Sequence, residues 1–375
     1  MSLLVLSADD VAALTASLSA DALCTMLAQT MAAIASHPPG ALAIQNPQRI
    51  ATESELHKTL YMPSRLTTSE GSATAIKVVA VPKPSCSLPG LPATTLLFDE
   101  ATGLARAVVN AAELTGIRTA AASALATKVL ADPSSTSLVV FGSGTQAYYH
   151  ARLILQLFPS LTAATFVVRS QSPRVGALLD RLQPDFPAVS CAAVTSEQAD
   201  DAVKGADIIC TCVPSTEPLF AAASLKPGVH INAIGSYTPT MLEFPPSLIT
   251  PSPPPPPPHP DADADADAES AAATVVAHIP LVLVDSAPAC LAEAGELHAA
   301  HTTPAQLVEL GTLLDPATGA LDPTDAARAA VAALRGGPGG RSLFKCVGVG
   351  GMDVAIARLV VDEAERQGRG ARVPF

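Results

Sequence analysis

The sequence predicts an α/β protein with a Rossmann-type, doubly wound parallel sheet, preceded by a mostly antiparallel β region. The apolar run Leu138–Phe141 leads directly into the glycine turn 142–147 (GSGTQA), and a helical pattern follows. Further apolar runs downstream alternate with helical patterns, which is typical of parallel sheets. Short runs rich in β-forming residues between 49 and 109 instead predict antiparallel strands.

Length and composition indicate a globular protein. The chain has 375 residues, enough for two domains, and 49% of them are hydrophobic while 15% are charged. The net charge is −12 and no cluster of Lys and Arg stands out, which argues against nucleic acid or an anionic membrane surface as a partner. Because no apolar run is long enough to span a bilayer and no targeting signal is evident, we expect no membrane association and a cytoplasmic location.

The seven cysteines are scattered along the sequence and show no spacing typical of zinc sites. We therefore expect reduced core thiols and no metal centre.

The region before the glycine turn contains helical and strand patterns. Residues 8–36 predict two helices, which Ser7 and Ser19 (or Asp21) can cap. The predicted strands are 49–52, 57–66, 74–81, 94–99 and 104–109, the last two forming a hairpin. A long Ala-rich helix is predicted over 111–131.

The glycine turn fits a dinucleotide pyrophosphate at a helix N-terminus. Gly142 would allow the tight turn, Gly144 the close approach of phosphate to the backbone, and Ala147 the packing of helix on strand. We expect residues Ser143, Thr145 and Gln146 of the same turn to contact the cofactor as well. Taken alone, this motif is equally typical of a purely structural turn.

The end of the next predicted strand, Thr165–Val168, indicates which cofactor binds. An acidic residue here would bind the ribose hydroxyls of NAD, but the chain has Arg169 and Ser170, with Arg174 one turn later. A cation and hydroxyls suit a 2′-phosphate, so we expect NADP(H), with NAD(H) as the alternative. Ordinary solvated arginines are the other interpretation.

The remaining pattern continues the α/β alternation. Strands are predicted at 206–213, 230–235, 281–285 and 342–348, and helices after Asp285 through Glu293 and Glu296 and at 352–367. A Pro-rich and Asp-Ala tract at about 245–273 cannot bury apolar area, so we expect a disordered surface insertion there. Residues 311–340 are predicted to be loop-rich.

Several segments together resemble the ornithine cyclodeaminase/mu-crystallin family, which includes archaeal alanine dehydrogenase and ketimine reductases. The matching segments include Pro47-Gln48-Arg49, LTGIRTAAA at 114–122, the glycine turn, ADIICTCVPSTEP at 206–218, KPGVHINAIG at 226–235, and AEAGEL at 292–297. The resemblance implies a homodimer and a discontinuous α+β domain, 1–130 with 335–375, for substrate binding and dimerisation. It also implies a Rossmann domain over 131–334, with the substrate between the two domains facing the nicotinamide.

Three cations match family positions that hold the substrate carboxylate: Arg49, Lys77 and Arg118. A clamp of this kind orients the C–N bond for hydride transfer. The alternative for Lys77 is an edge-strand lysine that points outward. Lys77 is also our candidate for catalysis, through a minor role in balancing imine protonation. We expect further cofactor contacts from Thr119, Val213, Pro214 and Gly235.

Tyr237 takes the place of an Asp that acts on the substrate amine in the cyclodeaminases that the chain resembles. A phenol has an unperturbed pKa of about 10 and is a poor base near neutrality, so we expect Tyr237 to line the substrate pocket or donate a proton instead. A side chain that only packs is the alternative. The resemblance to the mu-crystallin-like members, which also lack that Asp, implies NAD(P)H-dependent reduction of cyclic ketimine carboxylates to cyclic L-amino acids. The alternatives are an NAD-dependent ornithine cyclodeaminase, an amino-acid dehydrogenase, and a non-catalytic NADP-dependent binder of small molecules.

Overall fold

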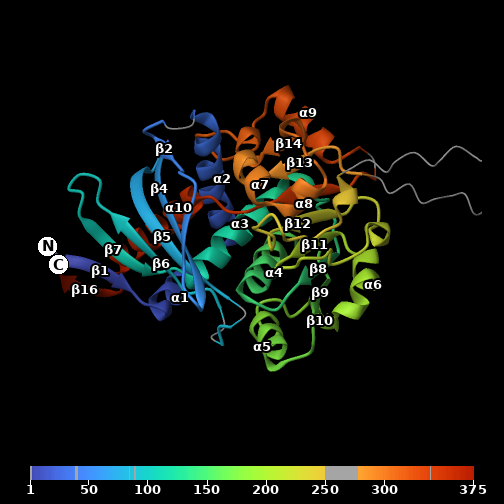
Figure 1. The fold of residues 1–375 in the computed structure, drawn as a ribbon, viewed down its shortest axis with the longest axis horizontal. Helices are drawn as coiled ribbons and strands as arrows, with labels where there is room; N and C mark the ends of the chain where they lie inside the picture. The colour runs from blue at the N-terminus through green and yellow to red at the C-terminus, as the bar shows by residue number, and fades with distance from the viewer. Residues whose placement is uncertain (1, 39–40, 84, 88–89, 250–277, 338) are drawn as a thin grey trace, which may run out of the picture.

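Two eight-stranded sheets form the body of the protein, with helices between and around them (Figure 1). The computed structural model describes residues 2–38, 41–83, 85–87, 90–249, 278–337 and 339–375. The two chain ends lie next to each other at the edge of the first sheet, where β1 and β16 pair.

The first sheet is antiparallel except at one pair, β1 with β7, and its strand order is β16-β1-β7-β6-β5-β4-β2, with β3 paired to β4. The mostly antiparallel region predicted from the sequence is thereby confirmed. The strands are β1 (Ser2–Leu6), β2 (Ile44–Gln45), β3 (Ile50–Glu53), β4 (His57–Thr68), β5 (Gly71–Pro82), β6 (Ala93–Phe98), β7 (Ala105–Asn110) and β16 (Ala371–Pro374).

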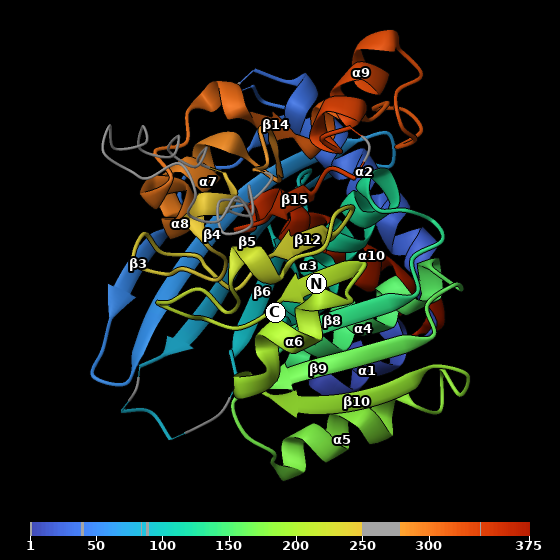
Figure 2. The ribbon, with the colours of Figure 1, turned by 90° about the vertical axis from the view of Figure 1, so that its right-hand side faces the viewer.

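The second sheet is parallel throughout, as predicted, with the order β10-β9-β8-β11-β12-β15-β13-β14. Figure 2 shows β8, β9 and β10 side by side at one end of this sheet. The strands are β8 (Ser137–Phe141), β9 (Ala163–Val168), β10 (Ser190–Thr195), β11 (Ile208–Thr211), β12 (His230–Ala233), β13 (Val282–Val284), β14 (Leu307–Glu309) and β15 (Ser342–Lys345).

Ten helices are assigned among the described residues. They are α1 (Ala8–Ala16), α2 (Ala20–Ser36), α3 (Ala112–Leu130), α4 (Thr145–Leu157), α5 (Pro173–Leu182), α6 (Ala199–Lys204), α7 (Ala287–Glu293), α8 (Gly295–Ala299), α9 (Asp325–Leu334) and α10 (Gly350–Gln367). The 3-10 turns are η1 (Ser196–Gln198), η2 (Ala222–Ser224), η3 (Pro246–Leu248), η4 (Pro304–Gln306) and η5 (Leu310–Leu313). The predicted caps are confirmed, since the Ser7 and Ser19 hydroxyls accept hydrogen bonds from the Asp10 and Ala22 N–H groups.

Helix α3 connects the two sheets, and α10 packs beside it on the first. Helix α10 packs on β4 and β5 of the first sheet, and α3 packs on α2, α4 and α10 and reaches β12 of the second. The close contact of α3 with α4 requires Gly116, because a Cβ there would lie 2.8 Å from Thr145 Cγ2. One continuous apolar core therefore runs from the first sheet into the second.

The structure corrects several expected boundaries. Residues 335–375 were expected to belong with residues 1–130. Strand β15 instead pairs with β12 and β13 of the second sheet, so that boundary was placed one strand too early. The stretch 311–340, expected to be loop-rich, contains α9, whose Thr324 cap and apolar face were overlooked. The helix expected through Glu293 and Glu296 is two helices, α7 and α8, separated at Ala294.

The first residues of the insertion expected at about 245–273 are instead part of the fold, because η3 and the fully buried Leu248 and Ile249 lie among them. Its remainder, 250–273, lies outside the described residues. Strands β1, β2, β10, β14 and β16 were also missed.

Of the helices in the described ranges, none taken singly has the length and apolar character needed to cross a membrane. Only α1 and α2 together reach that length and composition, and they are bent by 103°.

Candidate functional site

A cavity of about 160 Å³ lies where the two sheets approach each other, and it brings together most of the predicted site. All four expected substrate-binding residues line it: Arg49, Lys77, Arg118 and Tyr237. The expected cofactor contacts Thr119, Gln146, Pro214 and Gly235 line it too. Its remaining wall is mainly apolar, formed by Leu60, Met62, Val79, Val81, Leu91, Cys212, Ile234, Cys346 and Val347, with Thr115.

Lys77 and Arg118 are held together by one buried carboxylate, Asp353. Lys77 Nζ lies 2.8 Å from Asp353 Oδ2, and Arg118 Nε lies 3.0 Å from Asp353 Oδ1. All three side chains are at most 5% exposed. Two cations against one anion leave this cluster with a charge of +1, which suits one ligand carboxylate.

Burial and pairing set the protonation of this cluster. Burial lowers the pKa of Lys77 to about 8, although Asp353 opposes the shift. Burial opposes ionisation of Asp353, yet the attraction of Lys77 and Arg118 outweighs it and lowers the pKa of that carboxyl. At neutral pH all three groups are therefore charged.

The local sequence explains why these three groups meet. Lys77 shares the buried face of β5 with Ala73, Ala75 and Val79, beneath α10. Asp353 lies in the first turn of α10, where the helix dipole favours an anion.

Gly348, in the turn after β15, lies between Arg118 and Arg49. Gly348 has φ +84°, and a Cβ there would lie 2.6 Å from Arg118 Nη1, so only glycine admits the guanidinium. On the other side of the turn, Arg49 Nη2 donates to the Val347 and Gly348 carbonyls at 3.3 and 3.1 Å. Arg49 also pairs with Glu293 of α7 at 2.7 Å.

A second cavity of about 350 Å³ adjoins the first and shares Arg49 and Met62 with it. Glu293 and the residues before β3 line this second space. Burial raises the pKa of Glu293, and Arg49 opposes the shift.

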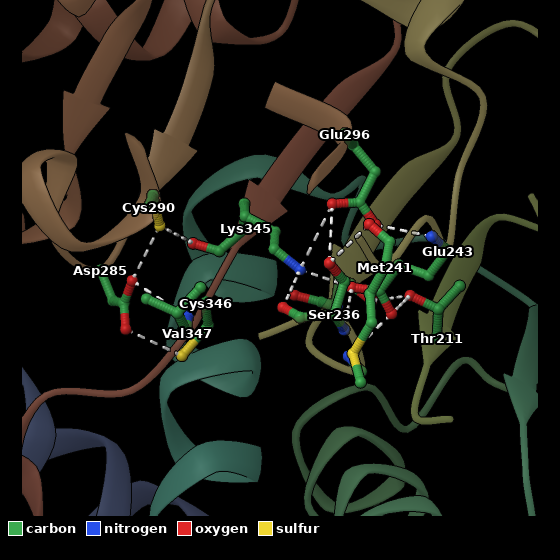
Figure 3. A network of polar contacts seen from close by, with 12 residues as sticks. Thr211, Ser236, Met241, Glu243, Asp285, Cys290, Glu296, Lys345, Cys346 and Val347 are labelled. Atoms are coloured by element: carbon green, nitrogen blue, oxygen red, sulfur yellow. Dashed lines mark hydrogen bonds and ion pairs between the residues drawn. The ribbon is translucent and has the colours of Figure 1, made fainter. Parts of the chain in front are cut away.

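The backbone beside Tyr237 is fixed by a buried ionic network (Figure 3). Glu243 accepts hydrogen bonds from Gly235 N at 2.7 Å, Ser236 N at 3.1 Å and Thr211 Oγ1 at 2.6 Å. Lys345 Nζ lies 2.6 Å from Glu243 and donates to Ser236 O. Burial alone lowers the pKa of Lys345, but Glu243 and Glu296 outweigh it and leave that pKa raised.

Asp285 fixes the backbone that follows Lys345, at Cys346 and Gly348. Figure 3 shows its carboxylate beside Cys290, Cys346 and Val347. Its Oδ2 accepts from Gly348 N at 2.6 Å and from the Cys346 thiol at 3.2 Å. Through Gly348, Asp285 therefore helps to position the turn between Arg49 and Arg118.

The turn 142–147 has the positive φ and the close backbone contacts that are typical of dinucleotide-binding turns. Gly142 has φ +112°, and a Cβ there would lie 2.7 Å from Val213 Cγ1. Gly235 approaches the same residue so closely that a Cβ would lie 2.1 Å from Val213 O. Gly144 precedes the first turn of α4, a 13-residue helix, and Ala147 within that turn is fully buried. Ser143 and Thr145 lie in the turn and the first turn of α4.

The residues expected to select the cofactor lie beside this turn. Arg174 Nε donates to Ser143 O at 3.1 Å, and its Nη2 lies 2.8 Å from where a Cβ of Gly144 would be. Arg169 and Ser170 are exposed directly after β9. The residues present therefore fit a dinucleotide, with the Arg174 guanidinium beside the turn 142–147.

The sequence interpretation missed Asp353, Glu293 and the Glu243–Lys345–Glu296 network. Asp353 carried a signal, since this acid stands between a glycine run and the apolar stretch Val354–Ala357. Lys345 in an apolar strand carried the same kind of signal as Lys77. Glu243 sits in a loop with no periodicity, and only the fold shows its partners.

Known proteins similar to this chain support a single family. Ketimine reductase mu-crystallin of Mus musculus is 34% identical over 163 residues, which are 44% of this chain and 49% of the relative. A Delta(1)-pyrroline-2-carboxylate reductase of Bacillus cereus is 26% identical over 331 residues, 86% of each chain. The alignment to the mu-crystallin thus spans about half the length of that relative.

The fold is shared with solved structures. The Thermococcus litoralis Delta(1)-pyrroline-2-carboxylate reductase, determined in complex with NADH and L-proline, superposes with a TM-score of 0.76 at 22% identity, covering 99% of this chain and all of that one. A sequence profile of the ornithine cyclodeaminase/mu-crystallin family matches residues 5–251. The chain therefore belongs to the ornithine cyclodeaminase/mu-crystallin family.

Proposed function

We propose that the protein reduces imines that bear a carboxylate, such as cyclic ketimine carboxylates, to cyclic L-amino acids with NADPH. The observation that carries this proposal is the cavity in which Arg49, Lys77 and Arg118 meet the residues beside the glycine turn. The similarity to a ketimine reductase and a pyrroline-2-carboxylate reductase supports it.

The three cations bind the substrate carboxylate. Arg118 and Lys77 are already ordered by Asp353, so a ligand meets fixed donors and little rotamer entropy is lost. The apolar wall at Leu60 and Val79 receives the hydrocarbon part of the ring and excludes water from it.

The dinucleotide is held by the turn 142–147 and α4, with Arg169, Ser170 and Arg174 beside them. Its nicotinamide end is bordered by Thr119, Val213, Pro214 and Gly235. When bound, the nicotinamide supplies hydride to the carbon of the C=N bond, whose nitrogen already carries its proton. The sum is one imine, one NADPH and one proton giving one amine and one NADP⁺. The protein therefore needs little acid–base chemistry, which agrees with a phenol at Tyr237.

Charge complementarity favours reduction over ornithine cyclodeamination. No Asp or Glu of the described chain lines the 160 Å³ cavity, so the second ammonium of a diamino acid would lack an anionic partner there. Burial also raises the pKa of Tyr237, so the phenolate, the form that could take a proton, is still scarcer near neutral pH.

The test is oxidation of NADPH by purified protein with a panel of cyclic imine carboxylates, with NADH in parallel and L-ornithine plus NAD⁺ as the opposing assay. Turnover of a cyclic imine, with NADPH preferred over NADH, supports the proposal. Proline and ammonia from ornithine without NADPH oxidation would overturn it.

The NADPH preference has its own test. Arg169→Ser removes the cation after β9, so we expect the KM for NADPH to rise about tenfold or more, by loss of a charge-assisted contact, while the KM for NADH changes little. Equal changes for both cofactors would contradict this assignment.

The proposal extends to a homodimer formed through the first sheet. Ile50 of β3, 67% exposed, is one of several large apolar side chains that remain exposed on that unit. Light scattering coupled to gel filtration should give twice the chain mass of 38.0 kDa, and the monomer mass would refute the dimer.

A further inference from the structure

The larger cavity, of about 350 Å³, continues the substrate space past Arg49. Arg49 and Met62 line both cavities, so the two spaces meet at these side chains. Their charges differ. Among the described residues that line the larger cavity, Glu293 is the only acid and Arg49 the only Lys or Arg, whereas three cations and no acid line the smaller one. A ligand that spans both spaces therefore meets positive charge at one end and a carboxylate at the other.

The carboxylate of Glu293, the last residue of α7, keeps an unused capacity to accept hydrogen bonds. Its Oε2 is buried and lies 2.7 Å from Arg49 Nη2, yet it accepts no hydrogen bond from the described residues. The reason is that Arg49 Nη2 has two protons and donates to the Val347 and Gly348 carbonyls, at 3.3 and 3.1 Å. Arg49 therefore stabilises Glu293 by its charge. A buried acceptor without a donor is commonly explained by a ligand or by function.

The chemistry of the larger cavity indicates which ligand group would reach Glu293. Its other polar side chains are neutral: Asn46, Gln48, Ser64 and Ser286. A charged donor forms the strongest hydrogen bonds with a carboxylate, and a ligand ammonium is compact and carries several protons. A ligand carboxylate at the same place would be repelled by Glu293.

We propose that Glu293 binds a distal ammonium group of the substrate, so that the protein favours imine carboxylates with an amino group beyond the reacting C=N unit. This inference rests on the proposed function and names its substrate class. The substrate carboxylate binds at Lys77 and Arg118, the C=N unit lies in the smaller cavity, and the ammonium passes Arg49 into the larger one. An ammonium at Glu293 is kept from the carbon that receives hydride, because Glu293 does not line the smaller cavity. The group is thus recognised, and it does not attack that carbon as the second amine of a cyclodeaminase substrate would.

Three amino acids with six-carbon chains read this contact without turnover. L-lysine, L-norleucine and L-2-aminoadipate share the α-amine and the α-carboxylate, but end in an ammonium, a methyl group and a carboxylate. Protein loaded with NADPH cannot take hydride from any of them. We expect calorimetry to give lysine a Kd about tenfold or more below that of norleucine, the order of one charge-assisted hydrogen bond. Aminoadipate should bind most weakly, because Glu293 repels its second carboxylate.

Variants of Glu293 test the assignment through ratios of Kd. The ratio is the readout because a change at Glu293 also affects Arg49, which contacts the α-carboxylate common to all three probes. Glu293→Gln should bring the ratio of norleucine to lysine to about one and bring aminoadipate closer to norleucine. Glu293→Asp, which keeps the charge, should retain the preference for lysine.

The matched control is Glu197→Gln in the exposed turn η1, which should leave every ratio unchanged. The Kd for NADPH of Glu293→Gln should stay within about twofold of wild type, which shows that the variant is folded. A preference for lysine that persists unchanged in Glu293→Gln overturns the inference.

The two proposals fail separately. A wild type that prefers lysine through Glu293 but reduces no imine refutes the proposed reaction and leaves the ammonium subsite standing. A wild type that reduces imines but binds norleucine as tightly as lysine refutes the ammonium subsite alone.

Discussion

At the scale of single residues, Asp353 touches both buried cations of the cavity. Asp353→Asn leaves two cations facing each other without a counter-charge, so we expect the free energy of unfolding to fall by about 3–5 kcal/mol. Asp362→Asn on the same helix is the matched control, because its pair with Arg106 is half exposed; it should change stability by about 0.5 kcal/mol or less. Chemical denaturation measures both, and equal midpoints would refute the role of Asp353.

Lys77 gives the site a pH dependence. Its pKa is lowered by burial to about 8 in the folded protein, against 10.5 ordinarily. Carboxylate affinity should therefore fall as pH rises through about 8, where Lys77 loses its charge. The same group makes folding stability rise with pH between about 8 and 10.5, because there the unfolded chain binds a proton that the folded chain does not.

Titration of pyrrole-2-carboxylate binding between pH 6 and 10 tests the sign for Lys77. Lys77→Met should bind weakly at every pH and lose the step near pH 8. A step that persists in Lys77→Met would show that another group titrates.

At the scale of elements, the Lys345–Glu243 pair ties β15 to the segment after β12. Lys345→Met leaves Glu243 and Glu296 buried together without their cation, and we expect a loss of about 3–5 kcal/mol in unfolding free energy. Lys204→Met breaks an exposed pair with Asp201 and should cost about 0.5 kcal/mol or less. Comparable losses in both variants would contradict the account.

The close approach of Gly235, after β12, to the Val213 backbone, after β11, permits a second comparison of two glycine variants. Gly235→Ala would place a Cβ 2.1 Å from Val213 O, forcing apart the strand ends that border the cavity. We expect a loss of at least about 1–3 kcal/mol and weaker NADPH binding. Gly176→Ala in α5 meets no atom within 4 Å and should gain up to about 1 kcal/mol; thermal unfolding with and without NADPH distinguishes them.

At the scale of the whole molecule, the sequence predicted what local patterns encode. Apolar runs and the glycine turn located β8, β9 and β11, and serine caps located α1 and α2. Strands β1 and β16 could not be found, because the two chain ends stabilise each other only after folding. The boundary expected between residues 334 and 335 was placed too early, because β15 joins the second sheet by pairing with β12 and β13, which are distant in sequence.

In the candidate site too, residues marked by a local pattern were found and partners distant in sequence were not. Lys77 and Arg118 were conspicuous because each is a charge within an apolar or Ala-rich segment. Their partner Asp353 lies 235 residues beyond Arg118 in the chain, and Glu243 sits in an irregular loop. Long-range ion pairs of this kind depend on the packing of α10 and β15, which no local pattern records.

The proposed function has this cavity direct hydride from a nicotinamide to the carbon of a C=N bond. The most direct measurement is a reaction of a cyclic imine carboxylate with NADPH deuterated at the transferred position, followed by mass spectrometry of the amino-acid product. Hydride transfer to the imine carbon should leave one deuterium, bound at the carbon that carries the carboxylate. Product without deuterium, or unlabelled proline formed from ornithine while NADPH is not consumed, would contradict it.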